Sequence, residues 1–100
     1  MQAKVTVADG LATVSLAGRF DFNAHREFRE AVDSSVQQST SGVKVDFGAV
    51  DYLDSSALGM LLMLRDKAKA AGRDVSLVNC QGPVKQVLDI ANFGKLFRIE

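Results

Sequence analysis

The sequence predicts an α/β fold in which helices pack on a mixed β-sheet, made of an N-terminal antiparallel hairpin plus parallel strands. Two observations predict this fold. The first is a pair of alternating segments separated by Asp9-Gly10, a dipeptide typical of two-residue hairpin turns. The second is that helix-like and strand-like segments alternate along the rest of the chain. Because a crossover helix joins strands that run in the same direction, the later strands are expected to pair in parallel.

The composition is typical of a soluble globular protein with one domain, residues 1–100. Hydrophobic residues make up 47% and charged residues 24% of the chain, as in ordinary soluble proteins. The formal net charge is zero, which gives no electrostatic reason to expect direct binding to nucleic acid or to an anionic membrane. The single cysteine forms no internal disulfide, and no signal peptide or apolar run of ~20 residues is recognisable. We therefore expect a cytoplasmic protein.

The N-terminal half is expected to form a hairpin, a helix and a further strand. These elements cover, in order, residues 3–8 and 11–17 for the hairpin strands, 24–37 for the helix and 43–47 for the strand. Gly18 is expected to end the second strand. The next five residues form a turn, in which Asp21 or Asn23 caps the helix. The strand over residues 43–47 is expected to pair in parallel with the second strand of the hairpin.

The C-terminal half is expected to contain two helices and two strands. After a connection over residues 48–53, these elements are a helix from Ser55 to about Ala71, a strand over 74–79, a helix that begins at Gly82-Pro83 and a strand-like tail over 96–99. Gly72 provides a stop for the long helix. The first half of this helix has almost no polar side, so it is either buried on several sides or presents an apolar patch to a partner.

The start of the long helix is the most informative stretch. Asp54 is a good N-cap, and Ser55 and Ser56 occupy the first turn, where the helix N-terminus favours a negatively charged phosphate. Hydroxyls in a first turn usually only satisfy backbone groups. Phosphorylation is favoured here by the apolar helix that follows and by Asp21, which is expected near the hydroxyl because it lies at the corresponding end of another element.

The apolar residues of the long helix divide into an expected core set and an expected surface set. Leu58, Leu61 and Leu62 are assigned to the core, whereas Met60 or Met63 is expected to be partly exposed, since methionine suits an adaptable interface.

Residues with enzymatic chemistry are few, and we expect neither catalysis nor a cofactor or metal. His25 is the only histidine and lies on the polar side of the first helix, where an idle role is the commoner one. Cys80 has no basic neighbour in the sequence and is expected to be a buried, inert thiol. The glycines form no phosphate-binding loop or dinucleotide fingerprint.

Residues 54–59, D-S-S-A-L-G, are similar to the D-S-S-G-L-G signature of STAS domains, specifically the bacterial anti-sigma-factor antagonists. Other segments resemble the same family in the same order: residues 18–21 its turn after the second strand, 45–54 its third strand and approach to the site, and 87–97 its closing helix and tail. Ala57 departs from the signature, where glycine is commoner, and favours helix in the first turn. The resemblance implies a STAS-like fold over nearly the whole chain.

The resemblance also implies a partner-switching mechanism. In this family the unphosphorylated antagonist binds an anti-sigma factor with a histidine-kinase-like ATPase fold, which often phosphorylates it on serine, and a PP2C-type phosphatase reverses the step. The usual acceptor corresponds to Ser56, with Ser55 as its neighbour. Asp21 is then either a residue that aids kinase recognition or a turn and cap residue. The expected partner contacts are Phe20, Phe22, Ala57, Met60 and Met63, although core packing is favoured for at least one of the two phenylalanines. A monomer or weak dimer is expected.

Two other functions fit the same resemblance. STAS proteins also serve as small subunits of a bacterial phospholipid-import ABC system, although the motif there often has threonine in place of a serine. A scaffold or ligand-sensing module within a larger signalling assembly is the third possibility, and such proteins usually carry an added sensory domain.

Overall fold

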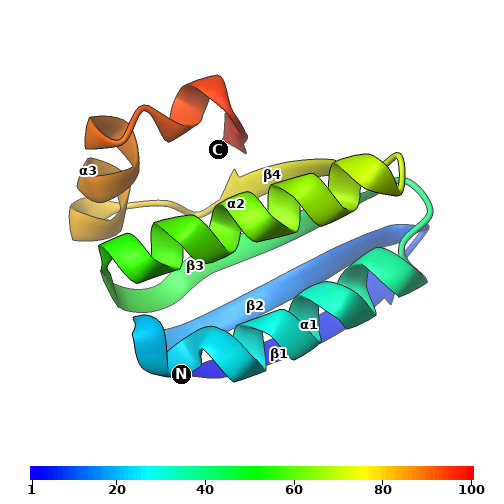
Figure 1. Ribbon diagram of the computed structural model, residues 1–100, viewed down its shortest axis with the longest axis horizontal. Helices are drawn as coiled ribbons and strands as arrows, with labels where there is room; N and C mark the ends of the chain where they lie inside the picture. Colours follow the sequence, from blue (N-terminus) through cyan, green and yellow to red (C-terminus); the bar gives the residue numbers. More distant parts are fainter.

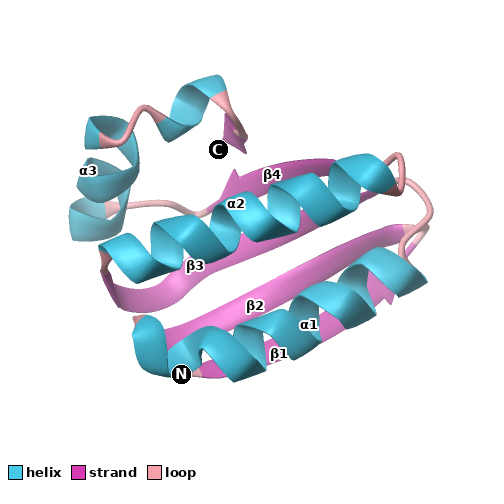
Figure 2. Ribbon diagram, viewed as in Figure 1, coloured by secondary structure: helices cyan, strands magenta, loops and turns pink.

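The computed structural model describes residues 1–100 and confirms the predicted mixed sheet. The strands lie in the order β1-β2-β3-β4-β5; β1 and β2 are antiparallel, and every later pair of neighbours is parallel (Figure 1, Figure 2). The elements are β1 (Gln2–Ala8), β2 (Leu11–Phe20), the 3-10 turn η1 (Phe22–Ala24), α1 (His25–Gln38), β3 (Gly42–Leu53), α2 (Ser55–Ala70), β4 (Asp74–Val78), α3 (Gly82–Ile90), the 3-10 turn η2 (Phe93–Lys95) and β5 (Arg98–Ile99). The predicted hairpin turn has positive φ angles at Asp9 (53°) and Gly10 (82°).

Helices α1 and α2 lie side by side on one face of the sheet, and α3 stands near the end where α2 begins (Figure 1). The core lies between the sheet and these helices. At its centre the ring of Phe20 lies 4.8 Å from that of Phe28 and 6.3 Å from that of Phe47, measured between centroids. An ion pair of 2.7 Å between Lys67 Nζ and Asp33 Oδ1 joins α2 to α1. The opposite face of the sheet carries polar residues that are at most half-buried.

The second and third strands are longer than predicted, and this corrects two expectations. Gly18, with φ of +96°, does not end β2, and residues 48–53 are not a connection but the second half of β3. The two strands stay paired up to the partners Phe20 and Leu53, although the register shifts twice on the way. At the first shift, Asp46 Oδ1 accepts hydrogen bonds from Gly48 N (2.8 Å) and Asn79 Nδ2 (3.0 Å). Pairing therefore continues beyond positions that look like strand ends in the sequence.

The other predicted elements are confirmed with small shifts at their ends. A 3-10 turn precedes α1, α2 ends at Ala70, and α3 begins at Gly82 as the proline predicted. The strand-like tail is shorter than expected, because only Arg98–Ile99 pairs with β4. Phe97 instead packs into the core, where its ring lies 5.5 Å from the ring of Phe93. None of the helices combines the length and the apolarity that crossing a lipid bilayer requires.

Candidate phosphorylation and docking site

The N-terminus of α2 has the predicted cap. Asp54 is extended (φ −112°, ψ −178°), and its Oδ1 accepts a hydrogen bond of 3.0 Å from Ala57 N. The serines follow in the first turn, where Ser55 is exposed and Ser56 is half-buried. Because the carboxylate of Asp54 caps the helix, neither serine hydroxyl is needed for that purpose. The hydroxyl of Ser56 thus lies in the positive field of the helix N-terminus.

The end of β2 lies directly beside this helix N-terminus. Asp54 N donates a hydrogen bond of 3.3 Å to the carbonyl oxygen of Phe20, and Asp21 is the next residue. The Oδ1 atom of Asp21 accepts from Asn23 N at 3.0 Å and so caps η1. Asp21 therefore caps the 3-10 turn that leads into α1, whereas α1 itself has Ala24 at its N-cap and no side-chain cap hydrogen bond, which corrects the prediction that Asp21 or Asn23 caps this helix. The long β2–β3 pairing also brings the backbone of Asp21 next to the start of α2. We call this end of the molecule, formed by the ends of β2 and β3, η1 and the first turn of α2, the Ser56 end.

Arg19 and Tyr52 are two residues of the Ser56 end that the sequence analysis did not identify. They are partners in the β2–β3 register, and the guanidinium carbon of Arg19 lies 4.0 Å from the centroid of the Tyr52 ring. Arg19 Nε also lies 3.6 Å from Asp21 Oδ2. The pairing requires Arg19 to lie in β2 and Tyr52 in β3, whereas local sequence patterns predict a turn and a connection at these positions, so they carry no direct signal for it.

Burial separates the predicted partner contacts into two groups. Phe22 is 71% exposed and Met63 is half-buried, so both are available to a partner. By contrast, Phe20 and Ala57 are completely buried and Met60 is 4% exposed, which corrects the expectation that these three contact a partner directly. The physical reason is packing: Phe20 belongs to the aromatic centre of the core, and the other two lie on the side of α2 that faces the core.

The core residues predicted on α2 are confirmed in part. Leu61 is completely buried, whereas Leu58 and Leu62 are half-buried and pack against the core from its margin. Two exposed apolar side chains lie in the elements of the Ser56 end, Tyr52 near the end of β3 (40% exposed) and Phe22 in η1. Met63 lies two turns further along α2 than Ser56.

Comparison with known proteins decides the family. The family model described as the STAS domain matches residues 2–100. The chain belongs to the STAS-domain family. A STAS-domain-containing protein of Pseudomonas aeruginosa is 47% identical over 93 residues, which cover 92% of this chain and 91% of that protein. The family that the motif at residues 54–59 resembles is therefore confirmed.

Solved structures show the same fold. An anti-sigma factor antagonist from Mycobacterium paratuberculosis has a TM-score of 0.86 at 23% identity, covering 98% of this STAS domain and 83% of that chain. The Bacillus protein SpoIIAA in its phosphorylated form has a TM-score of 0.72 at 18% identity, covering 98% and 90%. SpoIIAA, an anti-sigma factor antagonist, has the same TM-score and identity in its unphosphorylated form, covering 98% and 86%. At these identities the likeness shows the fold alone.

Cys80 and His25 are two further side chains with reactive groups in this STAS domain. Cys80 is buried, as predicted, and burial raises the pKa of its thiol to about 11. The positive charge of Lys85 lowers this pKa and the carboxylates of Asp46 and Asp89 raise it, both by less than burial does. His25 is exposed at the start of α1. No group of three or more His, Cys, Asp or Glu side chains is arranged to hold a metal ion.

Proposed function

We propose that this STAS domain is an anti-sigma-factor antagonist that binds an anti-sigma factor with a kinase-like ATPase fold, and that reversible phosphorylation of Ser56 controls this binding. The partner is the proposed kinase, and a PP2C-type phosphatase is proposed to remove the phosphate. The observation that carries the proposal is the first turn of α2. Asp54 Oδ1 accepts the cap hydrogen bond, which leaves Ser56 in the field of the helix N-terminus, at the end of the molecule that also carries the exposed Phe22 and Tyr52.

A phosphate on Ser56 is expected to act on binding and to leave the fold intact. Phosphoserine brings about −1.5 to −2 charges at neutral pH. The helix N-terminus stabilises such a charge by about 0.3–1 kcal/mol. The carboxylates of Asp21 and Asp54 oppose it by repulsion, so the two effects partly cancel within the domain. Phosphorylated and unphosphorylated SpoIIAA both share the fold of this chain, which supports that expectation.

At an interface the same charge has a larger effect. A partner that covers the Ser56 end excludes water from the phosphate, and an ion buried without a partner charge costs several kcal/mol. Phe22, at 71% exposure, offers an aromatic anchor of the kind that dominates protein interfaces. We therefore expect unphosphorylated protein to bind and phosphorylated protein to be released.

The choice of Ser56 over Ser55 rests on the family resemblance. Ser55 is the more exposed of the two, so accessibility by itself favours the first serine. Substitutions at both positions are therefore needed in the same experiment, with Ser55 providing the matched control one residue away.

The test is a pull-down from the native host with Ser56→Ala, Ser56→Asp and Ser55→Asp variants, read by mass spectrometry. Ser56→Ala should retain the partner, Ser56→Asp should bind at least about tenfold more weakly, and Ser55→Asp should lose much less. The wild-type protein should carry a phosphate that maps to residue 56. Normal binding by Ser56→Asp, or phosphate found only on Ser55, would contradict the proposal. Co-purification with an ABC ATPase and no phosphate would instead favour the role in phospholipid transport.

A further inference from the structure

The sheet face that lies away from α1 and α2 carries an ordered row of polar side chains. The strand register aligns Thr6 of β1, Thr13 of β2, Lys44 of β3, Ser76 of β4 and Arg98 of β5. Residues aligned in this way on adjacent strands share one face of the sheet. The row contains two positive charges and no carboxylate, and a hydroxyl lies between the two cations.

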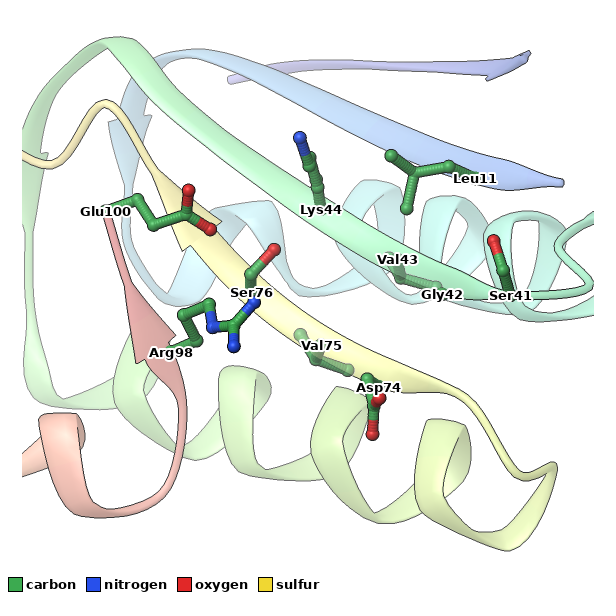
Figure 3. A pocket seen from close by; sticks show the side chains of 10 residues that line it. All are labelled: Leu11, Ser41, Gly42, Val43, Lys44, Asp74, Val75, Ser76, Arg98 and Glu100. Atoms are coloured by element: carbon green, nitrogen blue, oxygen red, sulfur yellow. The ribbon is translucent and has the colours of Figure 1, made fainter. Parts of the chain in front are cut away.

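A cavity of about 590 Å³ lies over one end of this row, and Lys44, Ser76 and Arg98 line it together with Asp74 and Glu100. Figure 3 shows Lys44, Ser76, Arg98 and Glu100 projecting from the strands, with the long helices behind the sheet. The charged residues that line the cavity form none of the protein's ion pairs; they are Lys44, Arg98, Asp74 and Glu100. Lys44 is half-buried as a residue and has no ion-pair partner.

We propose that this cavity binds a small phosphate monoester, with its phosphate between Lys44 and Arg98 and over the hydroxyl of Ser76. The strands that carry the two cations are separated by one strand, which places their backbones about 9–10 Å apart. Both side chains are long enough to converge on a group above Ser76. Arginine binds phosphate through two parallel N–H donors, lysine adds a point charge, and the serine hydroxyl donates a further hydrogen bond.

The carboxylates of the cavity define the rest of the ligand. Asp74 and Glu100 also line the cavity, and their carboxylates accept hydrogen bonds but donate none when ionised. They match hydroxyl or amino groups on the ligand and repel a second anionic group. A cavity of this volume falls within the range of about 300–1,000 Å³ that holds small ligands. A sugar phosphate or a nucleoside monophosphate therefore fits better than inorganic phosphate alone.

The proposed ligand site is separate from the Ser56 end. Gly42 and Asp74, the first residues of β3 and β4, line the cavity, whereas Ser56 follows the opposite end of β3. The site also lies on the sheet face away from α2. Ligand binding is thus a second function, and it does not depend on phosphorylation of the serine.

The test follows backbone amide NMR shifts of the full chain during titration with glucose 6-phosphate, adenosine monophosphate, inorganic phosphate and glucose. At least one phosphate ester should cause saturable shifts at Lys44, Ser76 and Arg98 below about 10 mM, and glucose should cause none. Lys44→Gln and Arg98→Gln should each weaken binding at least about tenfold, because each removes one of two phosphate-binding cations.

The matched controls are Arg29→Gln and Lys69→Gln, which remove exposed cations of α1 and α2 that do not line the cavity. Both should bind within about twofold of wild type. All four variants change polar surface residues, and their amide spectra report directly whether they are folded. The proposal is overturned if neither ester gives saturable shifts in the cavity, if glucose alone binds equally well, or if the control variants lose binding as much as Lys44→Gln and Arg98→Gln do.

Discussion

Substitution of Asp54 separates the two contributions that its carboxylate makes to the start of α2. In the native protein Oδ1 accepts from Ala57 N at 3.0 Å, and the negative charge lies at the positive end of a helix of 16 residues. Asp54→Ala removes both the acceptor and the charge. Asp54→Asn keeps a side-chain oxygen that accepts the same hydrogen bond and removes only the charge.

The structure sets the size of each effect. Loss of a capping side chain costs about 1 kcal/mol on average. Here the cost is expected near the upper end, about 2 kcal/mol, because Ala57 is completely buried and its N–H has no access to water as a replacement partner. The charge alone contributes about 0.3–1 kcal/mol. For a domain of 100 residues, each kcal/mol lowers Tm by about 5 °C.

Equilibrium unfolding in urea, followed by circular dichroism at 222 nm, measures both variants against wild type. Asp54→Ala should lower the free energy of unfolding by about 2 kcal/mol with an unchanged dependence on urea concentration, and Asp54→Asn by about 0.5 kcal/mol. If the two variants lose equal stability, the charge and not the cap is the important term. A loss below about 0.5 kcal/mol for Asp54→Ala would refute the capping argument altogether.

Three substitutions and one labelling reaction test other parts of the structure. Phe22→Ser should leave the free energy of unfolding within about 0.5 kcal/mol of wild type and should weaken partner binding at least about tenfold. Phe20→Ala should instead lower the free energy of unfolding in urea by about 3–5 kcal/mol. In the native protein Cys80, with its pKa near 11, should react with iodoacetamide at pH 8 about 100-fold more slowly than an ordinary thiol of pKa 9.0. In the protein unfolded by urea it should react at the ordinary rate. Fast labelling of the native protein would contradict this prediction. Asp46→Ala should destabilise the protein by about 0.5–1.5 kcal/mol, because the exposed Gly48 N loses its acceptor at the strand irregularity. An unchanged urea midpoint would show that water replaces this acceptor fully.

The hairpin, the helices and the capped turn of α2 could be predicted because each depends on a few neighbouring residues. Asp9-Gly10 adopts the backbone that its composition favours, and Asp54 caps the helix that follows it directly. The extension of β2 and β3 could not be predicted in this way. Gly18 resembles a strand end in the sequence, but pairing with the neighbouring strand continues across it. Arg19 and Tyr52 were missed for the same reason.

The orientation of α2 about its axis follows from one exposed charged residue in its second half. The first half of the helix is apolar on every side, so its own composition does not identify the buried side. The exposed Asp66 in the second half fixes the outward direction, since successive residues turn by about 100°. Met63 then lies about 60° from that direction and Met60 about 120° from it. This agrees with the half-buried and buried states of the two methionines.

The local charge at the Ser56 end explains why a phosphate there can control binding in a protein whose net charge is zero. Asp21, Asp51 and Asp54 contribute three carboxylates to this end, and Arg19 is the one cation that contacts it. A phosphoserine adds about −1.5 to −2 charges and so roughly doubles the local negative charge. At physiological ionic strength, charges are screened over about 8 Å, so this change acts on a partner in contact and not at long range. The proposed switch therefore requires a partner docked at the Ser56 end. The ratio of the partner's dissociation constants for Ser56→Asp and wild type should become smaller as salt is added.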